Sequence, residues 1–121
     1  MKRIISLLAV GAAGTAILLA VTPFAGARST MAQATTVKVT AKDSFRFTLS
    51  RSSAPHGKTV FKVTNKGRLK HDFAIAGKKT KMLSHGQTAT LTVTLKKGKH
   101  PYKCTVPGHA AAGMKGVFKS T

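Results

Sequence analysis

Acidic residues and cysteine are almost absent from this chain of 121 residues. Two aspartates stand against 21 lysines and arginines, and the formal net charge is +19 at pH 7. The single cysteine, Cys104, excludes a disulfide within the chain. The basic residues are spread over every segment and no nucleic-acid recognition motif accompanies them, so we expect no nucleic-acid partner. A charge of this size bears on partners and solubility rather than on fold.

Charge is also missing from the N-terminal region. After Lys2 and Arg3, no charged residue occurs between Ile4 and Ala27, and the run ends in the small residues Ala25-Gly26-Ala27. This pattern predicts a secretory signal peptide over residues 1–27. The alternative is an uncleaved anchor helix, because 24 uncharged residues are enough to span a bilayer. Both readings place the rest of the chain outside the cytoplasm: in the periplasm, on the outer face of the membrane, or outside the cell.

Residues 28–34 form a predicted linker, and residues 35–121 have the pattern of an all-β domain. Apolar and polar residues alternate with period 2, most clearly in "TATLTVTLKKG", and glycine, asparagine and proline separate the segments. No internal repeat and no convincing amphipathic helix is visible there. We expect an antiparallel β-sandwich of about seven strands. The predicted strands lie within residues 35–43, 45–50, 58–67, 71–77, 88–98, 100–104 and 116–120.

The cysteine belongs to the stretch "CTVPGHAAAGM", which lies between the last two predicted strands. Cys104, His109 and Met114 therefore share one loop, in which proline and glycine allow the chain to curl back. Thiolate, imidazole and thioether are soft or borderline ligands, and two histidines, one cysteine and a weak axial methionine are typical of a blue-copper site. His71, on a strand more than 30 residues upstream, is the natural second histidine.

In "YKCTVPGHAAAGMKG" and in its strand layout, the chain resembles the cupredoxins, the family of plastocyanins, azurins, halocyanins and auracyanins. The resemblance implies a Greek-key β-sandwich over residues 35–121. It also implies one type 1 copper held by His71, Cys104, His109 and Met114. The implied function is that of an exported protein that shuttles single electrons between redox partners through the Cu(I)/Cu(II) couple, without enzymatic activity.

Asp72 departs from the commonest cupredoxin pattern, in which asparagine follows the upstream histidine. We expect its carboxylate to accept a hydrogen bond from Thr105, next to the cysteine, and so to tie the two ligand segments together. Its negative charge should favour Cu(II) and lower the reduction potential.

The residues around His109 are small and apolar, which in the family is typical of a surface for weak redox encounters. The predicted docking residues are Pro107, Gly108, Ala110, Ala111, Ala112 and Gly113. Lys103 and Lys115 flank this segment and would steer a redox partner with an acidic face. Anionic envelope polymers or a membrane surface are further expected partners, and we expect a monomer.

Three other functions remain open from the residues alone. A carrier or store of Cu(I) needs the same ligand types, and a cationic module that binds envelope polymers needs no copper. An enzyme with Cys104 as nucleophile lacks a visible oxyanion hole. A multicopper oxidase is excluded, because no further histidine pairs are present. Of the other histidines, His56 and His85 are expected in turns and His100 is a weak candidate for supporting the metal site, while Met82 is expected in the core.

Overall fold

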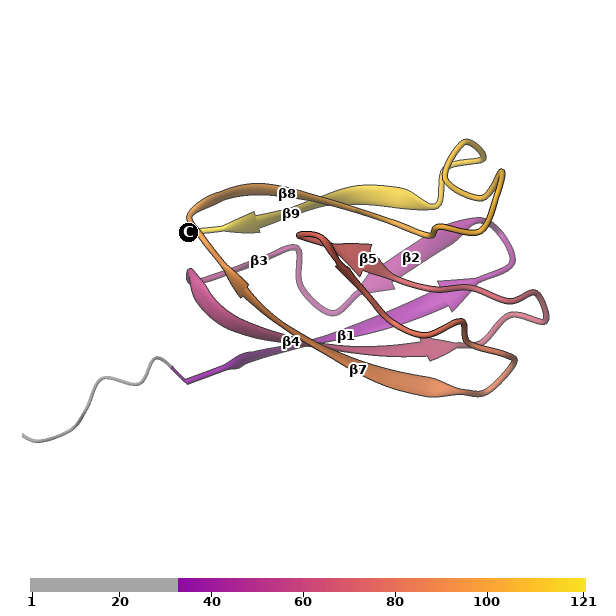
Figure 1. Cartoon of the computed structure of the whole chain (residues 1–121), viewed down its shortest axis with the longest axis horizontal. Helices are drawn as coiled ribbons and strands as arrows, with labels where there is room; N and C mark the ends of the chain where they lie inside the picture. Colours follow the sequence, from indigo (N-terminus) through magenta and orange to yellow (C-terminus); the bar gives the residue numbers. More distant parts are fainter. Residues whose placement is uncertain (1–32) are drawn as a thin grey trace, which may run out of the picture. The chain divides into compact units, whose positions relative to one another are not determined.

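The computed structural model describes residues 33–121, in which nine β-strands form two sheets (Figure 1). The predicted signal peptide and most of the predicted linker lie outside the described residues. Within the described part of the chain, no helix is long and apolar enough to cross a membrane. One sheet has the order β2 (Arg46–Leu49), β1 (Thr35–Lys42), β4 (Gly57–Asn65) and β7 (Thr88–Leu95). The other has the order β3 (Ser53–Ala54), β9 (Lys115–Ser120), β8 (Gly98–Lys103), β5 (Ala74–Ile75) and β6 (Lys78–Lys79).

The predicted all-β sandwich is confirmed, and each of the seven predicted strands is present. The sheets are mixed rather than wholly antiparallel, since β1 is parallel to β4 and β3 is parallel to β9. Between β2 and β4 the chain passes through β3 in the other sheet, so β4 returns in the direction of β1. The strands that the sequence did not reveal, β3 and β6, have two residues each. A strand of two residues is too short to show an alternating pattern.

The core lies between the two sheets and follows from the alternating pattern of the strands. Phe61 from β4, Phe73 before β5 and Phe118 from β9 are fully buried. The rings of Phe61 and Phe118 meet edge to face with centroids 5.3 Å apart, which links one sheet to the other. In β7, exposed threonines alternate with the apolar residues that face the core. The packed core gives a rigid support to the loops at its ends.

A buried asparagine orders the segment that leads from β4 to His71. Asn65 is fully buried, and its side-chain Nδ2 donates to the carbonyl oxygens of Leu69 and Leu83, both at 2.8 Å. Its Oδ1 accepts a hydrogen bond from the Gly67 N–H at 2.8 Å. All three side-chain hydrogen bonds hold backbone groups, so this one residue fixes the path of the chain towards the candidate site.

Candidate metal centre

Two connections bring the predicted ligands to the same end of the sandwich. His71 lies between β4 and β5 and forms a two-hydrogen-bond bridge with Leu83. Cys104 directly follows β8 and Met114 directly precedes β9, and the Cys104 N–H donates to the Met114 carbonyl at 3.0 Å. The loop between them, at the right-hand end of Figure 1, is closed further by the Met114 N–H donating to the His109 carbonyl at 3.0 Å. The ligand-bearing segments are therefore tied to both sheets.

His71, Cys104 and His109 present their donor atoms to one point, as predicted. The His71 Nδ1 lies 3.2 Å from the His109 Nδ1, and the Cys104 Sγ lies 3.6 Å from the same nitrogen. One donor atom from each of the three residues lies within 4.8 Å of the others. His71 and Cys104 are buried and His109 is half-buried. Two imidazoles and a thiol at this spacing have the chemistry that copper prefers.

Met114 is fully buried beside these residues. It packs in a small cluster with Ala41 and Cys104, against which the partly buried Phe45, Phe47 and Val106 lie. The thioether therefore lies in a dry, apolar surrounding close to the thiol. The structure thus places the fourth predicted residue in the same pocket of side chains as the cysteine.

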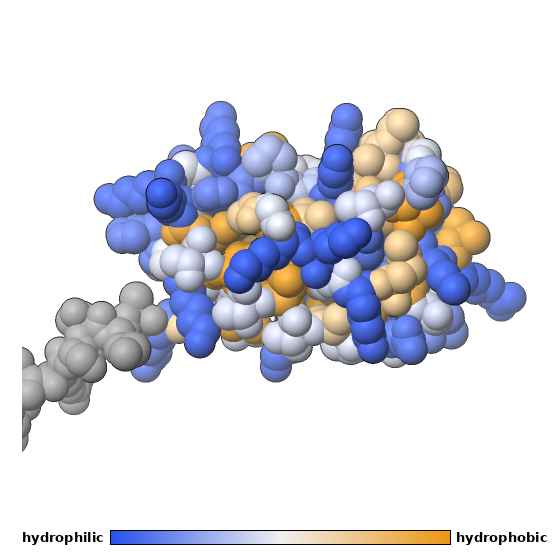
Figure 2. Space-filling model, in the orientation of Figure 1, coloured by the Kyte–Doolittle hydropathy of each residue, from blue (hydrophilic) through white to orange (hydrophobic). Residues whose placement is uncertain are grey.

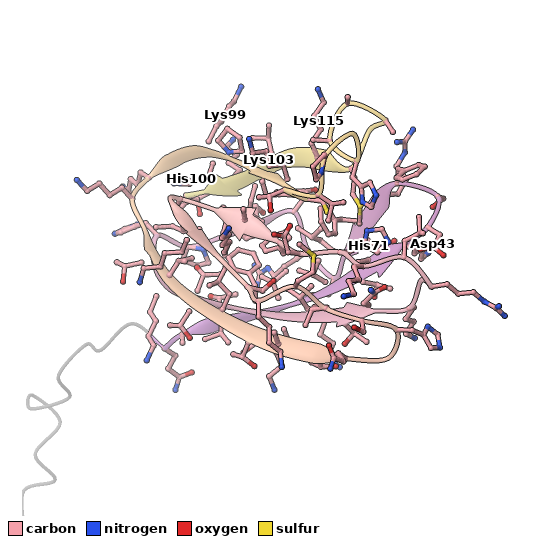
Figure 3. All side chains as sticks on the ribbon, turned by 45° about the vertical axis from the view of Figure 1, so that its right-hand side comes forward. Asp43, His71, Lys99, His100, Lys103 and Lys115 are labelled. Atoms are coloured by element: carbon pink, nitrogen blue, oxygen red, sulfur yellow. The ribbon has the colours of Figure 1, made fainter. Side chains whose placement is uncertain are left out.

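Asp43 also belongs to this site, although no motif in the sequence pointed to it. Its Oδ1 lies 3.0 Å from the His71 Nε2, and the two side chains lie together in Figure 3. Its carboxylate also accepts the backbone N–H groups of Arg68 at 2.7 Å and Leu69 at 3.1 Å. These hydrogen bonds, first that of Arg68 and then that of His71, hold the pKa of Asp43 below its usual value.

The contact with Asp43 decides which nitrogen of His71 is free. An ionised carboxylate accepts only, so the Nε2 of His71 carries the proton and the Nδ1 has its lone pair directed to the site. Gly67 gives room for this arrangement, because a Cβ at that position would lie 2.0 Å from the Asp43 Oδ1. The Asn-Lys-Gly turn after β4 is the one sequence feature related to this contact.

The predicted hydrogen bond between Asp72 and Thr105 is present. The buried Asp72 carboxylate accepts the Thr105 backbone N–H at 2.6 Å and also the Thr105 hydroxyl. Asp72 follows His71 and Thr105 follows Cys104, so this pair joins the two ligand segments directly. Each oxygen of this buried carboxylate therefore has a hydrogen-bond donor.

Phe45 lies at the metal centre, in the turn between β1 and β2. Its φ of 56° is unusual for a bulky residue and turns its ring onto His109, with centroids 5.0 Å apart in an edge-to-face contact. The next residue, Arg46, donates from Nη1 to the Ala112 carbonyl at 3.3 Å. The β1–β2 turn thus supports the ligand loop from one side.

Burial determines the protonation of the ligands before any metal binds. It raises the pKa of the Cys104 thiol, and it lowers the pKa of His109, to which the neighbouring His71 adds a smaller effect. At neutral pH the imidazole of His109 is therefore neutral and ready to bind a metal, while the thiol must lose its proton on binding.

The remaining histidines form hydrogen bonds with backbone carbonyl groups. The Nδ1 of His56 contacts the Thr121 carbonyl at 2.9 Å, and that of His85 contacts the Gly67 carbonyl at 2.8 Å. The Nε2 of His100, in β8, contacts the Lys96 carbonyl at 2.7 Å, and His100 is not among the residues whose donor atoms converge at the metal centre. Met82, expected in the core, is 44% exposed because it lies in the loop before Leu83 instead of in a strand.

Comparisons with known proteins agree with this geometry. Residues 24–119 match the model of the copper binding proteins of the plastocyanin/azurin family. Among curated proteins, no sequence matches the chain.

Solved structures with the same fold include a dithionite-reduced auracyanin from the photosynthetic bacterium Roseiflexus castenholzii. It is 22% identical, with a TM-score of 0.64 over 73% of this chain and 98% of that one. Auracyanin A from Chloroflexus aurantiacus is 15% identical, with a TM-score of 0.60 over 71% and 98%. An azurin from Methylomonas sp. strain J is 16% identical, with a TM-score of 0.59 over 72% and 98%. With copper as its cofactor at the His71–Cys104–His109 cluster, this chain belongs to the plastocyanin/azurin family of cupredoxins.

Proposed function

We propose that the chain is an exported carrier of single electrons, with one type 1 copper bound by the Nδ1 atoms of His71 and His109, the Cys104 thiolate and the Met114 thioether. The observation that carries this proposal is the convergence of the three donor atoms within 4.8 Å, beside the fully buried methionine. The copper, when bound, supplies the Cu(I)/Cu(II) couple. Nothing in the ligand set calls for a substrate to bind to the metal.

The protein's part in electron transfer is to keep the ligands in place. Asp43 holds the ring of His71 through Nε2, and Phe45 packs against the ring of His109. Asp72 bridges to Thr105 beside the cysteine. Because each ligand segment is held by hydrogen bonds or packing, the ligands need to move little when the copper changes oxidation state. A small rearrangement lowers the barrier to electron transfer.

The edge of His109 is the proposed point at which electrons enter or leave. His109 is half-buried, and the adjoining residues Pro107, Gly108, Ala111 and Ala112 are exposed. Figure 2 shows apolar residues gathered at the end of the domain where the ligand loop lies, among hydrophilic side chains that project around it. Small side chains permit close approach without strong adhesion, as a transient redox complex requires. We propose that the partner presents acidic groups to the lysines nearby and that the carrier acts as a monomer outside the cytoplasm.

Electrochemistry of the copper-loaded protein tests this proposal. A reversible one-electron couple, together with fast electron self-exchange measured by NMR line broadening in mixtures of the Cu(I) and Cu(II) forms, is the expected result. An air-stable, colourless Cu(I) form without a reversible couple would contradict it and would indicate a copper carrier or store instead.

A further inference from the structure

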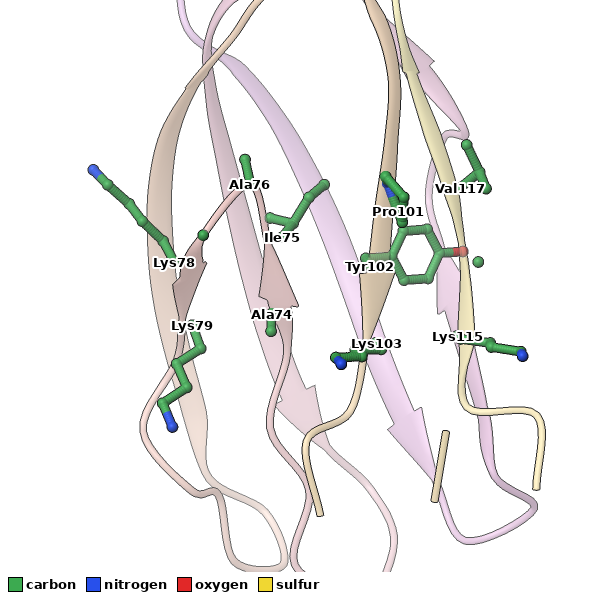
Figure 4. A pocket seen from close by; sticks show the side chains of 12 residues that line it. Ala74, Ile75, Ala76, Lys78, Lys79, Pro101, Tyr102, Lys103, Lys115 and Val117 are labelled. Carbon is green, nitrogen blue, oxygen red and sulfur yellow. The ribbon is translucent and has the colours of Figure 1, made fainter. Parts of the chain in front are cut away.

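The outer face of the five-stranded sheet has a hollow that the metal centre does not use. It has a volume of about 800 Å³ and lies over β5, β6, β8 and β9 (Figure 4). We call this hollow the lysine groove, because Lys78, Lys79, Lys103 and Lys115 line it together with apolar residues such as Pro101 and Val117. The hollow is left open because the adjoining positions Ala74, Ala76 and Gly77 have little or no side chain.

Lysines face one another across this sheet without a counter-charge. Lys103 is paired with Lys115 in the β8–β9 register, and Lys99 is paired with Lys119 further along the same two strands. All four are exposed, and Figure 3 shows Lys99, Lys103 and Lys115 projecting from these strands. On the neighbouring strands, Lys79 is paired with Ala74, which is in turn paired with Lys103.

Like charges directly opposite each other destabilise a sheet. The only two acidic residues of the chain, Asp43 and Asp72, are engaged at the metal centre. The chain therefore contains no carboxylate side chain that is free to neutralise these lysine pairs, and an external anion would relieve their repulsion.

An apolar strip lies between the two lysine pairs. Val117, which is 52% exposed, is paired with the exposed Pro101. A simple anion such as phosphate would make no favourable contact with this apolar strip. A surface in which carboxylates surround a protruding apolar side chain would match both the charge and the hollow.

The lysine groove also adjoins the metal centre through the backbone. Lys103 directly precedes Cys104, and Lys115 directly follows Met114. A protein held in the groove would lie beside the two strands that carry these residues. This position favours an electron-transfer partner over a lipid surface, and a bilayer would present no protruding side chain to fill a concave site.

We propose that the lysine groove is the docking site of an acidic redox partner protein, which inserts an apolar side chain into the hollow against Pro101 and Val117 and pairs its carboxylates with Lys79, Lys103 and Lys115. This inference rests on the proposed function, because it concerns where the partner of the electron carrier binds. It places the docking contact on the sheet beside Cys104, apart from the loop of residues 105–113 that carries His109.

NMR mapping with an acidic peptide tests the docking site. The full-length protein, labelled with ¹⁵N and holding Cu(I), is titrated with the pentapeptide Glu-Glu-Leu-Glu-Glu, blocked at both ends. The largest amide shifts are expected at Ala76, Lys103, Gly116 and Val117. Shifts centred on residues 105–113 or on the four-stranded sheet would overturn the proposal.

A matched pair of double variants separates the groove from the general positive charge. Lys79→Gln/Lys103→Gln removes two charges from the groove and should raise the peptide Kd about tenfold, or about 1.4 kcal/mol. Lys38→Gln/Lys62→Gln removes two charges from exposed positions paired in the β1–β4 register of the other sheet, and should change the Kd less than about twofold. Equal losses in the two variants would show a diffuse field and overturn the proposal.

Two further measurements identify the kind of partner. In the first, a reduced acidic [2Fe–2S] ferredoxin is mixed with the Cu(II) protein, to which it passes one electron. The second-order rate constant of this electron transfer at low salt should fall about tenfold in the groove variant only. The reduction potential of each variant is measured alongside, so a loss of the redox couple, which would refute the proposed function, is distinguished from a loss of docking. Binding to phosphatidylglycerol vesicles that depends on the groove, without a change in the ferredoxin rate, would overturn the choice of a protein partner.

Discussion

At the scale of single residues, the negative charge of the chain is concentrated at the metal centre. Asp43 contacts His71 and Asp72 contacts Thr105, whereas the 21 basic residues are spread over the rest of the chain. A field of many positive charges favours Cu(I), the less positive ion. The two carboxylates oppose this effect at short range, and each can be tested by an isosteric change to asparagine.

Asp72→Asn should raise the reduction potential. The amide oxygen still accepts the Thr105 N–H, so the geometry is kept while one negative charge near the copper is lost. One charge at several ångströms in a protein interior is worth up to about 2 kcal/mol, which corresponds to tens of millivolts. Voltammetry checks this result, and an unchanged or lower potential would rule out the charge argument.

Asp43→Asn should also raise the potential and, in addition, weaken copper binding. The carboxylate fixes the His71 tautomer and increases the basicity of its Nδ1, and loss of such a partner typically costs 10- to 100-fold in metal affinity. Competition with a chelator measures the affinity of Cu(II) for the two proteins. If the affinity falls equally in Asp43→Asn and Asp72→Asn, the specific role of the His71 contact is refuted.

At the scale of elements, the positions of the strands and of the ligand loop were predictable from the sequence. The pairing of the strands and the contacts that hold the ligand loop were not. Period-2 alternation located β1, β4 and β7, and the Cys104–Met114 spacing located the loop. The parallel pairing of β1 with β4 could not be read locally, because it depends on the passage of the chain through the other sheet. Asp43 and Phe45 escaped detection because their contacts join residues far apart in sequence.

Asn65→Ala should destabilise the fold through the segment that carries His71. The change leaves the Leu69 carbonyl and the Gly67 N–H without their side-chain partner, whereas the Leu83 carbonyl loses one of its two donors and keeps the His71 N–H. Each buried unsatisfied group costs about 1–3 kcal/mol, so we expect a loss of roughly 2–4 kcal/mol in the free energy of unfolding. Urea denaturation of the metal-free protein measures it. A loss below about 1 kcal/mol would show that water replaces the asparagine without cost.

At the scale of the whole molecule, the metal-free protein should lose stability in acid in two stages. The pKa of His109 is lowered in the folded state, so unfolding takes up a proton as the pH falls through about 6.5, the usual histidine value, and stability declines. The lowered pKa of Asp43 adds a second decline, as the pH falls below about 4 towards its folded value.

Thermal melts of the metal-free protein between pH 8 and pH 3 measure both stages. His109→Gln should remove the first stage and keep the second, whereas Asp43→Asn should do the reverse. A melting temperature that stays constant from pH 8 to pH 5 in the unaltered protein would contradict the role of His109.

Titration of the metal-free protein with one equivalent of Cu(II), followed by visible absorption and EPR, tests the type 1 copper site most directly. We predict an intense blue or green thiolate-to-copper band and a narrow copper hyperfine splitting, both absent in Cys104→Ser. A colourless product with wide hyperfine splitting, or a spectrum that Cys104→Ser leaves unchanged, would contradict the assignment of this site.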